Sequence, residues 1–178
     1  MYHNTVTLKN GVAVPQLGLG TWFIDDADVA GAVQAAAGLG YRHFDTAQAY
    51  GNERGVGEGV RTCGVPRAEL FVTSKVAAEH KTYEAAKNSI DETLQKMKLD
   101  YLDMMIIHSP QPWDKVNQCE DRYVEGNRAA WRALEDAYKA GKLRAIGVSN
   151  FQVGDLESLR ADCTIQPMVD QILLHISN

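Results

Sequence analysis

Short apolar runs alternate along the chain with segments whose apolar residues recur at helical spacing, and this alternation constrains the fold most strongly. The runs lie at residues 16–20, 41–45, 70–74, 103–108, 144–148 and 167–173. Some are almost free of polar residues, as in Met-Met-Ile-Ile at 104–107, which is typical of strands covered on both faces. Strands that alternate strictly with helices predict an α/β fold with a parallel sheet and right-handed crossovers.

The clearest helical pattern lies at residues 83–97, where apolar residues are spaced three or four apart and Thr82 is the expected N-cap. A second apolar stripe, at residues 131–138, is followed by Gly141, a residue typical of helix C-termini. Weaker helices, two of them rich in glycine, are predicted at residues 26–39, 52–62 and 152–161. The segment at 109–122 has no such pattern and is expected to be a long functional loop.

The N-terminal residues 5–14 read as a β-hairpin. Apolar residues alternate with polar ones on both sides of Asn10-Gly11, and Pro15 ends the pattern. The Asn-Gly pair predicts a type I′ turn, in which both central residues have positive φ.

The length of 178 residues predicts one domain, and 45% hydrophobic residues are enough for a core. A complete eight-unit (β/α) barrel needs about 250 residues, so this length would supply between five and six units. The formal net charge of −5 gives no electrostatic basis for binding nucleic acid or an anionic membrane surface.

The expected location is the cytoplasm. The three cysteines, Cys63, Cys119 and Cys163, are widely spaced and lack a CxxC motif, which is typical of a reducing compartment. The N-terminus lacks the basic and apolar regions of a signal peptide, and no apolar run approaches the roughly 20 residues that span a bilayer.

The residues that end each predicted strand, or follow it closely, are the candidates for a functional site. In chain order they are Gly20, Thr21 and Trp22, then Asp45 and Tyr50, then Lys75, then His108, then Ser149 and Asn150, and finally Gln171. In parallel α/β folds the carboxyl ends of the strands meet at one rim, where ligands bind. Four of these residues are expected to form one proton-transfer set: Asp45, Tyr50, Lys75 and His108.

The chemistries of these four side chains fit together. Tyrosine is a poor acid at neutral pH, and a nearby ammonium such as that of Lys75 favours the tyrosinate. Asp45 can keep Lys75 charged, while a neutral His108 can donate a hydrogen bond to a carbonyl oxygen that becomes negative. The five histidines show no HxxxH or HxH spacing, which disfavours a metal hydrolase, and no metal site is expected.

Taken singly, each of these residues also has a structural interpretation. A lone histidine at a strand end is often only hydrogen-bonded, a lone lysine is usually solvated, and Asp45 before a threonine can cap a turn. It is their position at the ends of successive strands that favours a shared site.

Three stretches carry a family resemblance. Residues 40–53, GYRHFDTAQAYGNE, closely resemble the first signature of the aldo-keto reductases, and residues 99–110, LDYLDMMIIHSP, resemble the second. Residues 146–151, IGVSNF, are similar to that family's stretch after strand five. The resemblance implies a (β/α)8 TIM barrel closed at its base by an N-terminal hairpin. Residues 1–178 would form a single domain with about six strands and five helices of that barrel.

The resemblance also implies roles for individual residues. Tyr50 would be the general acid that protonates a carbonyl oxygen, Lys75 and Asp45 would strengthen it as an acid, and His108 would orient the carbonyl. Hydride would come from NADPH, with NADH as the alternative, bound without a GxGxxG motif. The cofactor-binding residues would be Gly20, Thr21, Asp45, Ser149, Asn150 and Gln171, and the substrate-binding residues Trp22, Tyr50, His108 and Trp113.

The chain departs from the family pattern in several places. Ser109 and Ala77 stand where members often have tryptophan, so the pocket is expected to be wider unless Trp113 replaces the lost wall. Asp170 stands where asparagine is usual, and its carboxylate would weaken cofactor binding. Strands seven and eight, which follow strand six in the family, have no counterpart in the 178 residues.

These observations leave three hypotheses of function. The first is the NAD(P)H-dependent reduction of aldehydes and ketones, with a small-molecule carbonyl substrate and neither nucleic acid nor membrane as partner. The second is a catalytically inactive partial barrel or fragment, which would associate with itself or another chain because an open sheet exposes a strand edge. The third is a binding or regulatory protein built on the same fold.

Overall fold

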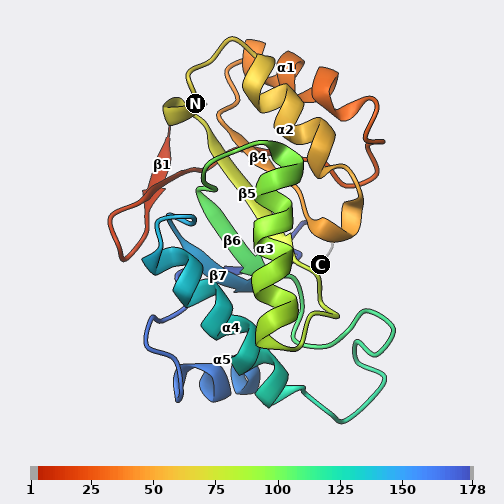
Figure 1. Ribbon diagram of the computed structural model, residues 1–178, viewed down its shortest axis with the longest axis vertical. Coiled ribbons are helices and arrows are strands. Elements are labelled where there is room, and N and C mark those ends of the chain that lie inside the picture. Colours follow the sequence, from red (N-terminus) through yellow and green to blue (C-terminus); the bar gives the residue numbers. More distant parts are fainter. Residues whose placement is uncertain (1–3, 177–178) are drawn as a thin grey trace.

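A curled sheet of six parallel strands forms the centre of the computed structural model, which describes residues 4–176 (Figure 1). The strands are β3 (Gly18–Gly20), β4 (His43–Asp45), β5 (Phe71–Val76), β6 (Met104–Ile107), β7 (Ile146–Ser149) and β8 (Asp170–Gln171). Their order in the sheet is their order in the chain, as in a (β/α)8 barrel. The predicted α/β fold with part of a barrel is therefore confirmed.

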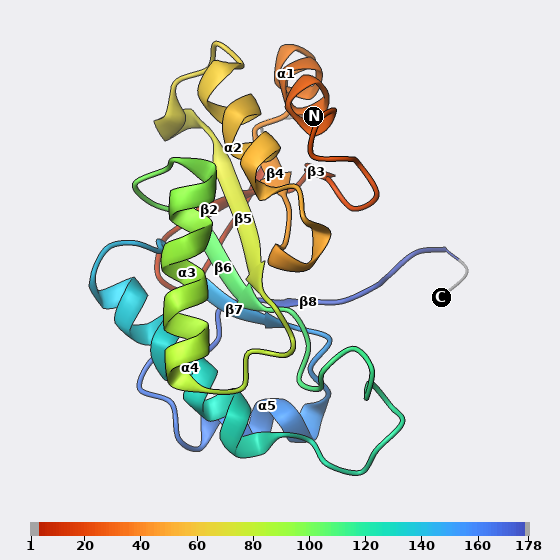
Figure 2. The same ribbon diagram turned by 45° about the vertical axis from the view of Figure 1, so that its right-hand side comes forward.

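Five α-helices in the described residues cover the outer face of this sheet (Figure 2). They are α1 (Val29–Gly38), α2 (Glu53–Thr62), α3 (Tyr83–Met97), α4 (Val124–Lys139) and α5 (Val153–Arg160). Two short 3-10 helices, η1 (Gln48–Tyr50) and η2 (Arg67–Glu69), precede α2 and β5. The hydroxyl oxygen of Thr82 accepts a hydrogen bond of 3.2 Å from the Ala85 N–H, which confirms the predicted N-cap of α3.

Alternation along β6 explains its unbroken apolar sequence. Met105 and Ile107 belong to the main core between the sheet and the helices, where Trp131 and Leu134 of α4 also lie. Met104 and Ile106 face the other side of the sheet and pack against the N-terminal hairpin. Both faces of the strand are thus covered, as its composition predicts.

Glycines in α2 permit close packing of its neighbours. A side chain at Gly57 would place its Cβ 2.3 Å from the carbonyl oxygen of Met97 at the end of α3. At Gly59 the Cβ would lie 2.7 Å from a side-chain carbon of Val33 in α1. The same residues that weaken the helical pattern in the sequence therefore allow α2 to fit between two helices.

The predicted hairpin is present, but its turn is not of type I′. Strands β1 (Thr5–Thr7) and β2 (Ala13–Pro15) pair antiparallel. Gly11 has a φ of 86° whereas Asn10 does not have positive φ, and the Gly11 N–H donates to the Leu8 carbonyl at 2.9 Å. This is a three-residue loop that ends in a left-handed glycine. The side-chain oxygen of Asn10 accepts a hydrogen bond of 3.2 Å from the Val12 N–H.

Within the described residues the sheet remains open between β3 and β8, which each have a single neighbouring strand. An interior cavity of about 620 Å³ lies between them and is partly lined by the hairpin. Both edge strands, β3 and β8, are shorter than the predicted runs at residues 16–20 and 167–173. The segment after β8 runs away from the sheet and exposes Ile172, Leu173 and Leu174 (Figure 2).

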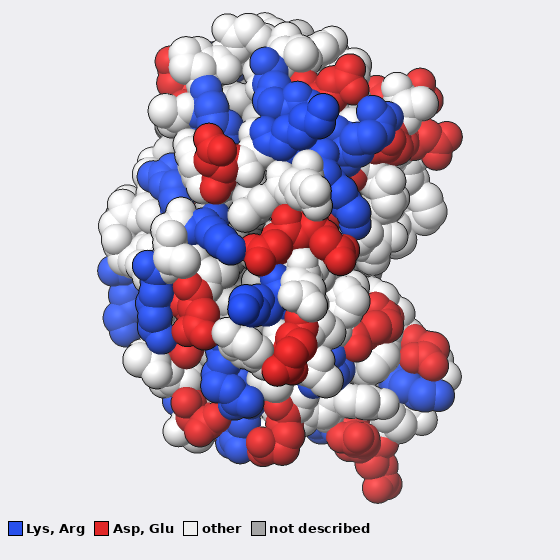
Figure 3. Space-filling model, viewed as in Figure 1, with Lys and Arg blue, Asp and Glu red and all other residues white. Residues whose placement is uncertain are grey.

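The surface shows no single dominant charge on the face in Figure 3, where acidic and basic side chains are interspersed. None of the helices in residues 4–176 combines the length and the apolar character needed to cross a membrane.

Candidate functional site

Lys75 is the centre of a polar cluster at the carboxyl ends of β4, β5 and β6. The side chain is 2% exposed, although it carries a charge, and it forms an ion pair with Asp45. Its ammonium also donates to the Thr46 carbonyl at 2.9 Å and to the Tyr50 hydroxyl at 3.2 Å. A buried ammonium needs such partners, and here they fill its three donor positions.

Tyr50 lies in η1, the turn that follows β4. Gly51 ends this turn with a φ of 71°, a conformation that glycine adopts without strain. The Tyr50 ring lies next to two other aromatic groups, with centroids 6.2 Å from Trp22 and 5.5 Å from the His108 ring. The Tyr50 ring is therefore in contact with the Trp22 and His108 rings, while its hydroxyl is held by the Lys75 ammonium.

His108 ends β6 and stands nearly perpendicular to Tyr50, with an interplanar angle of 75°. Burial, together with the nearby Lys75 ammonium, lowers the pKa of His108 to about 4, while Asp45 opposes the shift. The imidazole is consequently neutral at pH 7. The Nδ1 atom of His108 is buried and has no hydrogen-bond partner among the described residues. A neutral imidazole carries its proton on either Nδ1 or Nε2, and a buried N–H without an acceptor is the more costly arrangement. The proton is therefore favoured on Nε2.

A second polar group continues from this cluster across β7 and β8. The Ser149 hydroxyl donates to the Gln171 carbonyl at 2.7 Å, and the Asn150 amide donates to Ser149 Oγ and to the His108 carbonyl, both at 3.0 Å. Gln171 Nε2 donates to Asp45 Oδ2 at 2.9 Å. The amide oxygens of Asn150 and Gln171 accept no hydrogen bond within residues 4–176, so both remain available to a ligand.

A cavity of about 690 Å³ lies above these groups. Its walls are Trp22, Ala49, Tyr50, His108, Trp113, Ser149, Asn150, Gln171, Ile172 and Leu173. The Trp113 ring meets His108 edge-on, with centroids 4.9 Å apart. A cavity with apolar walls and a few convergent polar groups is the usual form of a small-molecule site.

The structure thus brings the four predicted proton-transfer residues into direct or ring contact and places the predicted substrate residues around one cavity. Gly20 and Thr21, which were predicted to bind the cofactor, do not line this cavity. Gly20 lines the interior cavity beneath the sheet rim, and Thr21 is buried with its N–H and hydroxyl both donating to the Asp45 carbonyl, at 3.0 and 3.1 Å. Thr21 therefore fixes the backbone of Asp45 through these two hydrogen bonds.

The sequence reasoning missed the residues that hold the site in place. Asn52 is fully buried and donates to the carbonyls of Thr21 and Ile24, both at 2.8 Å, which fixes the segment carrying Trp22. Glu79 accepts from the Trp113 N–H at 3.1 Å, and Lys81 donates to the Ser109 carbonyl at 2.9 Å. Asn52 had a signal in the sequence, because it lies within the signature stretch at residues 40–53, whereas Glu79 and Lys81 only follow a predicted strand closely.

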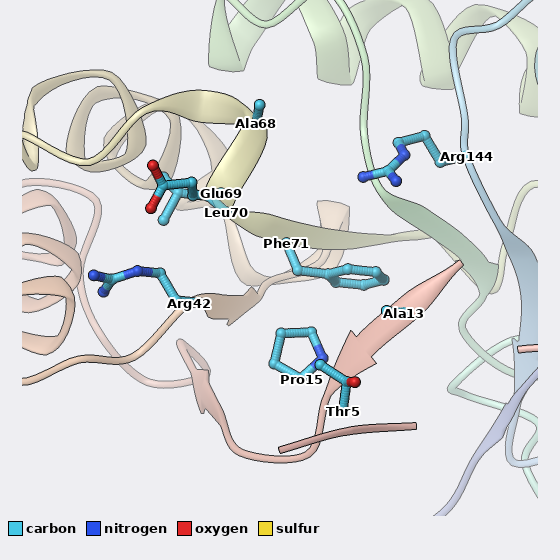
Figure 4. Close-up of a pocket in the computed structure, with 9 residues that line it drawn as sticks. All are labelled: Thr5, Ala13, Pro15, Arg42, Ala68, Glu69, Leu70, Phe71 and Arg144. Atoms are coloured by element: carbon cyan, nitrogen blue, oxygen red, sulfur yellow. The ribbon is translucent and has the colours of Figure 1, made fainter. Parts of the chain in front are cut away.

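A second hollow, at the opposite ends of the strands, lacks comparable chemistry (Figure 4). Two arginines lie beside it, but both have partners: Arg42 donates to the Ala37 and Tyr41 carbonyls, and Arg144 pairs with the buried Asp103 at 2.6 Å. These two arginines therefore serve to stabilise the base of the sheet.

Comparison with known proteins agrees with this geometry. The family model described as the aldo/keto reductase family matches residues 16–178. The chain is 46% identical over 173 residues to a glyoxal reductase of Bacillus subtilis, covering 97% of this chain and 58% of that protein. It is 38% identical over 170 residues to the methylglyoxal reductase DkgA of Escherichia coli O157:H7, covering 96% and 58%.

Solved structures show the same relationship. An aldo/keto reductase from Brucella melitensis superimposes with a TM-score of 0.88 at 38% identity, covering 97% of this chain and 63% of that one. A Bombyx mori aldo-keto reductase in complex with NADP superimposes with a TM-score of 0.82 at 31% identity, covering 98% and 59%. The chain spans less than two thirds of the length of each of these proteins. The family model, these identities and the shared fold show that the chain belongs to the aldo/keto reductase family.

Proposed function

We propose that the protein reduces aldehydes and ketones to alcohols with a hydride from NAD(P)H, and that Tyr50 is the general acid. The observation that carries this proposal is the Lys75 ammonium, which contacts both Asp45 and the hydroxyl of Tyr50, a residue that lines the cavity. A Tyr–Lys–Asp arrangement beside a neutral imidazole suits proton donation to an oxygen that gains negative charge.

The donor and acceptor set at β7 and β8 fits a nicotinamide. A carboxamide has two N–H groups and one oxygen, and the free amide oxygens of Asn150 and Gln171 could accept its N–H groups. The Asn150 amide is held by Ser149 Oγ and the Gln171 amide by Asp45, while the Ser149 hydroxyl donates to the backbone carbonyl of Gln171. The NADP complex of the Bombyx mori neighbour supports NADPH, and NADH is the alternative to be tested. A reduced nicotinamide bound there supplies the hydride for the carbonyl carbon.

The residues of this chain supply the proton and the orientation. The carbonyl oxygen accepts hydrogen bonds from the Tyr50 hydroxyl and from His108 Nε2, which directs the carbonyl carbon towards β7 and β8. Tyr50 would donate its hydroxyl proton to the carbonyl oxygen as negative charge develops there during reduction of the carbon. Lys75 stabilises the resulting tyrosinate, which regains a proton from solvent.

We propose a small carbonyl compound as the substrate. The cavity presents Trp22 and Trp113 as aromatic walls and Ala49 as a small one, and its polar lining residues are few. The names of the Bacillus subtilis and Escherichia coli relatives, glyoxal and methylglyoxal reductase, suggest a short dicarbonyl as the first substrate to test.

The three cysteines are all free thiols in the structure, which supports the proposed cytoplasmic location. The comparisons do not favour an inactive partial barrel, because the named relatives are reductases. Self-association through the open sheet edge remains a prediction, tested by the mass of the chain in solution.

Transfer of deuterium tests the proposed reaction. Methylglyoxal is supplied with NADPH or NADH deuterated at C4 of the nicotinamide, on its transferred face. The enzyme is either the 178-residue chain or that chain joined after residue 178 to the C-terminal part of the Bacillus subtilis glyoxal reductase. We expect an alcohol with deuterium on the former carbonyl carbon. The proposal is wrong if neither form yields such a product while both melt cooperatively.

A further inference from the structure

The segment that carries Tyr50 is attached at both ends to one hydroxyl group outside the sheet. Gln48 begins this segment and donates from Nε2 to Thr93 Oγ1 and to the Ser89 backbone carbonyl, both at 3.1 Å; the carbonyl is kept in any Ser89 or Thr93 variant. Glu53 follows three residues after Tyr50, and its carboxylate accepts from the same Thr93 hydroxyl at 3.0 Å. Thr93 lies on α3, beside α2 (Figure 1), so its single hydroxyl links both sides of the Tyr50 turn.

The same two side chains also hold the strand that carries Lys75. Glu53 accepts from the Ser74 hydroxyl at 2.6 Å, and the Gln48 amide oxygen accepts from the Ala77 N–H at 2.8 Å. Lys75 lies between these two attachment points. Because side chains alternate along a strand, Ser74 points outwards to the helices while Lys75 points into the site.

The four residues Gln48, Glu53, Ser74 and Thr93 form what we call the Thr93 network. It is well shielded from water, since Ser74 and Thr93 are fully buried and Glu53 is 3% exposed. Burial raises the pKa of the Glu53 carboxyl, and the hydrogen bonds from Ser74 and Thr93 oppose that shift. Loss of either hydroxyl would leave a buried carboxylate short of donors, which favours rearrangement of the segment.

We propose that Thr93 is a positioning residue, whose hydroxyl holds the Tyr50 turn against β5 and so keeps the Tyr50 hydroxyl within hydrogen-bond distance of the Lys75 ammonium. None of the four network residues lines the cavity, so they act on the reaction through the segments that carry Tyr50 and Lys75. The catalytic consequence rests on the proposed function, whereas the geometric consequence does not.

Three variants of α3 test this role. Thr93→Val removes the hydroxyl with almost no change of shape, and Thr93→Ser keeps the hydroxyl. The matched control is Ser89→Ala, one helical turn earlier, because the buried Ser89 hydroxyl donates to Ala86 of the same helix and to no catalytic segment.

The first readout is the 13C signal of the Tyr50 Cζ carbon, assigned by its loss in Tyr50→Phe. We expect Thr93→Val to displace this signal, and Thr93→Ser and Ser89→Ala to leave it at the wild-type position. In turnover, Thr93→Val should lower kcat about ten- to a hundredfold with KM for the carbonyl little changed, as for a small displacement of a catalytic group. A wild-type Tyr50 signal in folded Thr93→Val would overturn the proposal.

A second variant keeps the test decisive if Thr93→Val does not fold. Gln48→Met removes the links to Thr93, Ala77 and the Ser89 carbonyl at a half-buried position, and it should displace the Tyr50 signal in the same direction. An unchanged signal in folded Gln48→Met would also contradict the network's role. If the wild-type chain reduces no carbonyl, the proposed function fails, and the Tyr50 signal still decides the question of the network.

Discussion

The Lys75 ammonium lies 3.2 Å from the Tyr50 hydroxyl oxygen, although the two residues belong to different β/α units. The Lys75 side chain is buried, and Asp45 pairs with it from the end of the neighbouring strand. The hydroxyl therefore faces a cation that cannot move away into solvent. This relationship makes Tyr50 a proton donor in our account, and it leads to specific expectations for single variants.

Replacing Lys75 by methionine should nearly abolish turnover while the chain still folds. Methionine fills a similar volume but supplies no charge for the tyrosinate, so we expect kcat to fall about 10²- to 10⁴-fold. Asp45 would lose its cation but keep the hydrogen bond from Gln171, and we expect unfolding free energy to fall by about 3 kcal/mol. Steady-state kinetics and urea denaturation measure the two effects.

The matched control for Lys75 is Lys142→Met, which removes a half-exposed lysine that pairs with Asp91 far from the rim. It should keep wild-type kcat. A Lys75→Met enzyme within twofold of wild-type kcat would show that the ammonium does not assist Tyr50.

His108 should make the stability of the protein depend on pH between about 4 and 6.5. The native pKa is about 4, against 6.5 for an exposed histidine, so the unfolded chain binds more protons in this window. Stability from this group is complete above about pH 6.5 and is lost as the pH falls towards 4. His108→Gln should therefore lose less unfolding free energy than wild type between about pH 7 and about pH 5.

Urea denaturation at both pH values measures this difference. The pKa of His43 is also lowered by burial, but that contribution is present in both proteins and cancels in the comparison. Equal losses in wild type and His108→Gln would mean that His108 is not held neutral by the fold.

Trp113 should determine how well the pocket binds bulky carbonyl compounds. Its ring stands edge-on to His108 and forms a wall of the cavity, so Trp113→Ala removes an aromatic contact worth about 1 kcal/mol. We expect KM for benzaldehyde to rise about fivefold and KM for methylglyoxal to change less. The control is Leu39→Ala, which changes an exposed apolar residue directly after α1. If Trp113→Ala left the ratio of the two KM values unchanged, Trp113 would not be part of the substrate pocket.

The sequence was sufficient to predict the order of elements and the rim of the site. Parallel strands leave little freedom at their carboxyl ends, so residues such as Asp45 and His108, which end apolar runs, have to meet there. The helix α2 was harder to predict, because glycine has a low helix propensity. The close packing of Gly57 against Met97 and of Gly59 against Val33 explains why glycines are present there. The turn at Asn10-Gly11 was mispredicted in type, since the dipeptide also suits a loop with one left-handed glycine.

The contacts that support the site could not be predicted from the sequence. Thr93 reads as an ordinary position on an amphipathic helix, and its link to Gln48 and Glu53 depends on how α3 lies against the Tyr50 turn. Likewise, the Glu79 contact to the Trp113 backbone joins two loops whose paths no local pattern determines. Such long-range polar contacts require the packed structure.

The most direct test of the account is the effect of Tyr50→Phe on the reduction of methylglyoxal, measured with cofactor binding in the same enzyme. Phenylalanine keeps the ring between Trp22 and His108 but removes the hydroxyl that would donate the proton. We predict that kcat falls at least about 10²-fold while the affinity for NADPH is unchanged. A Tyr50→Phe enzyme that retains wild-type kcat would contradict the assignment of Tyr50 as the general acid.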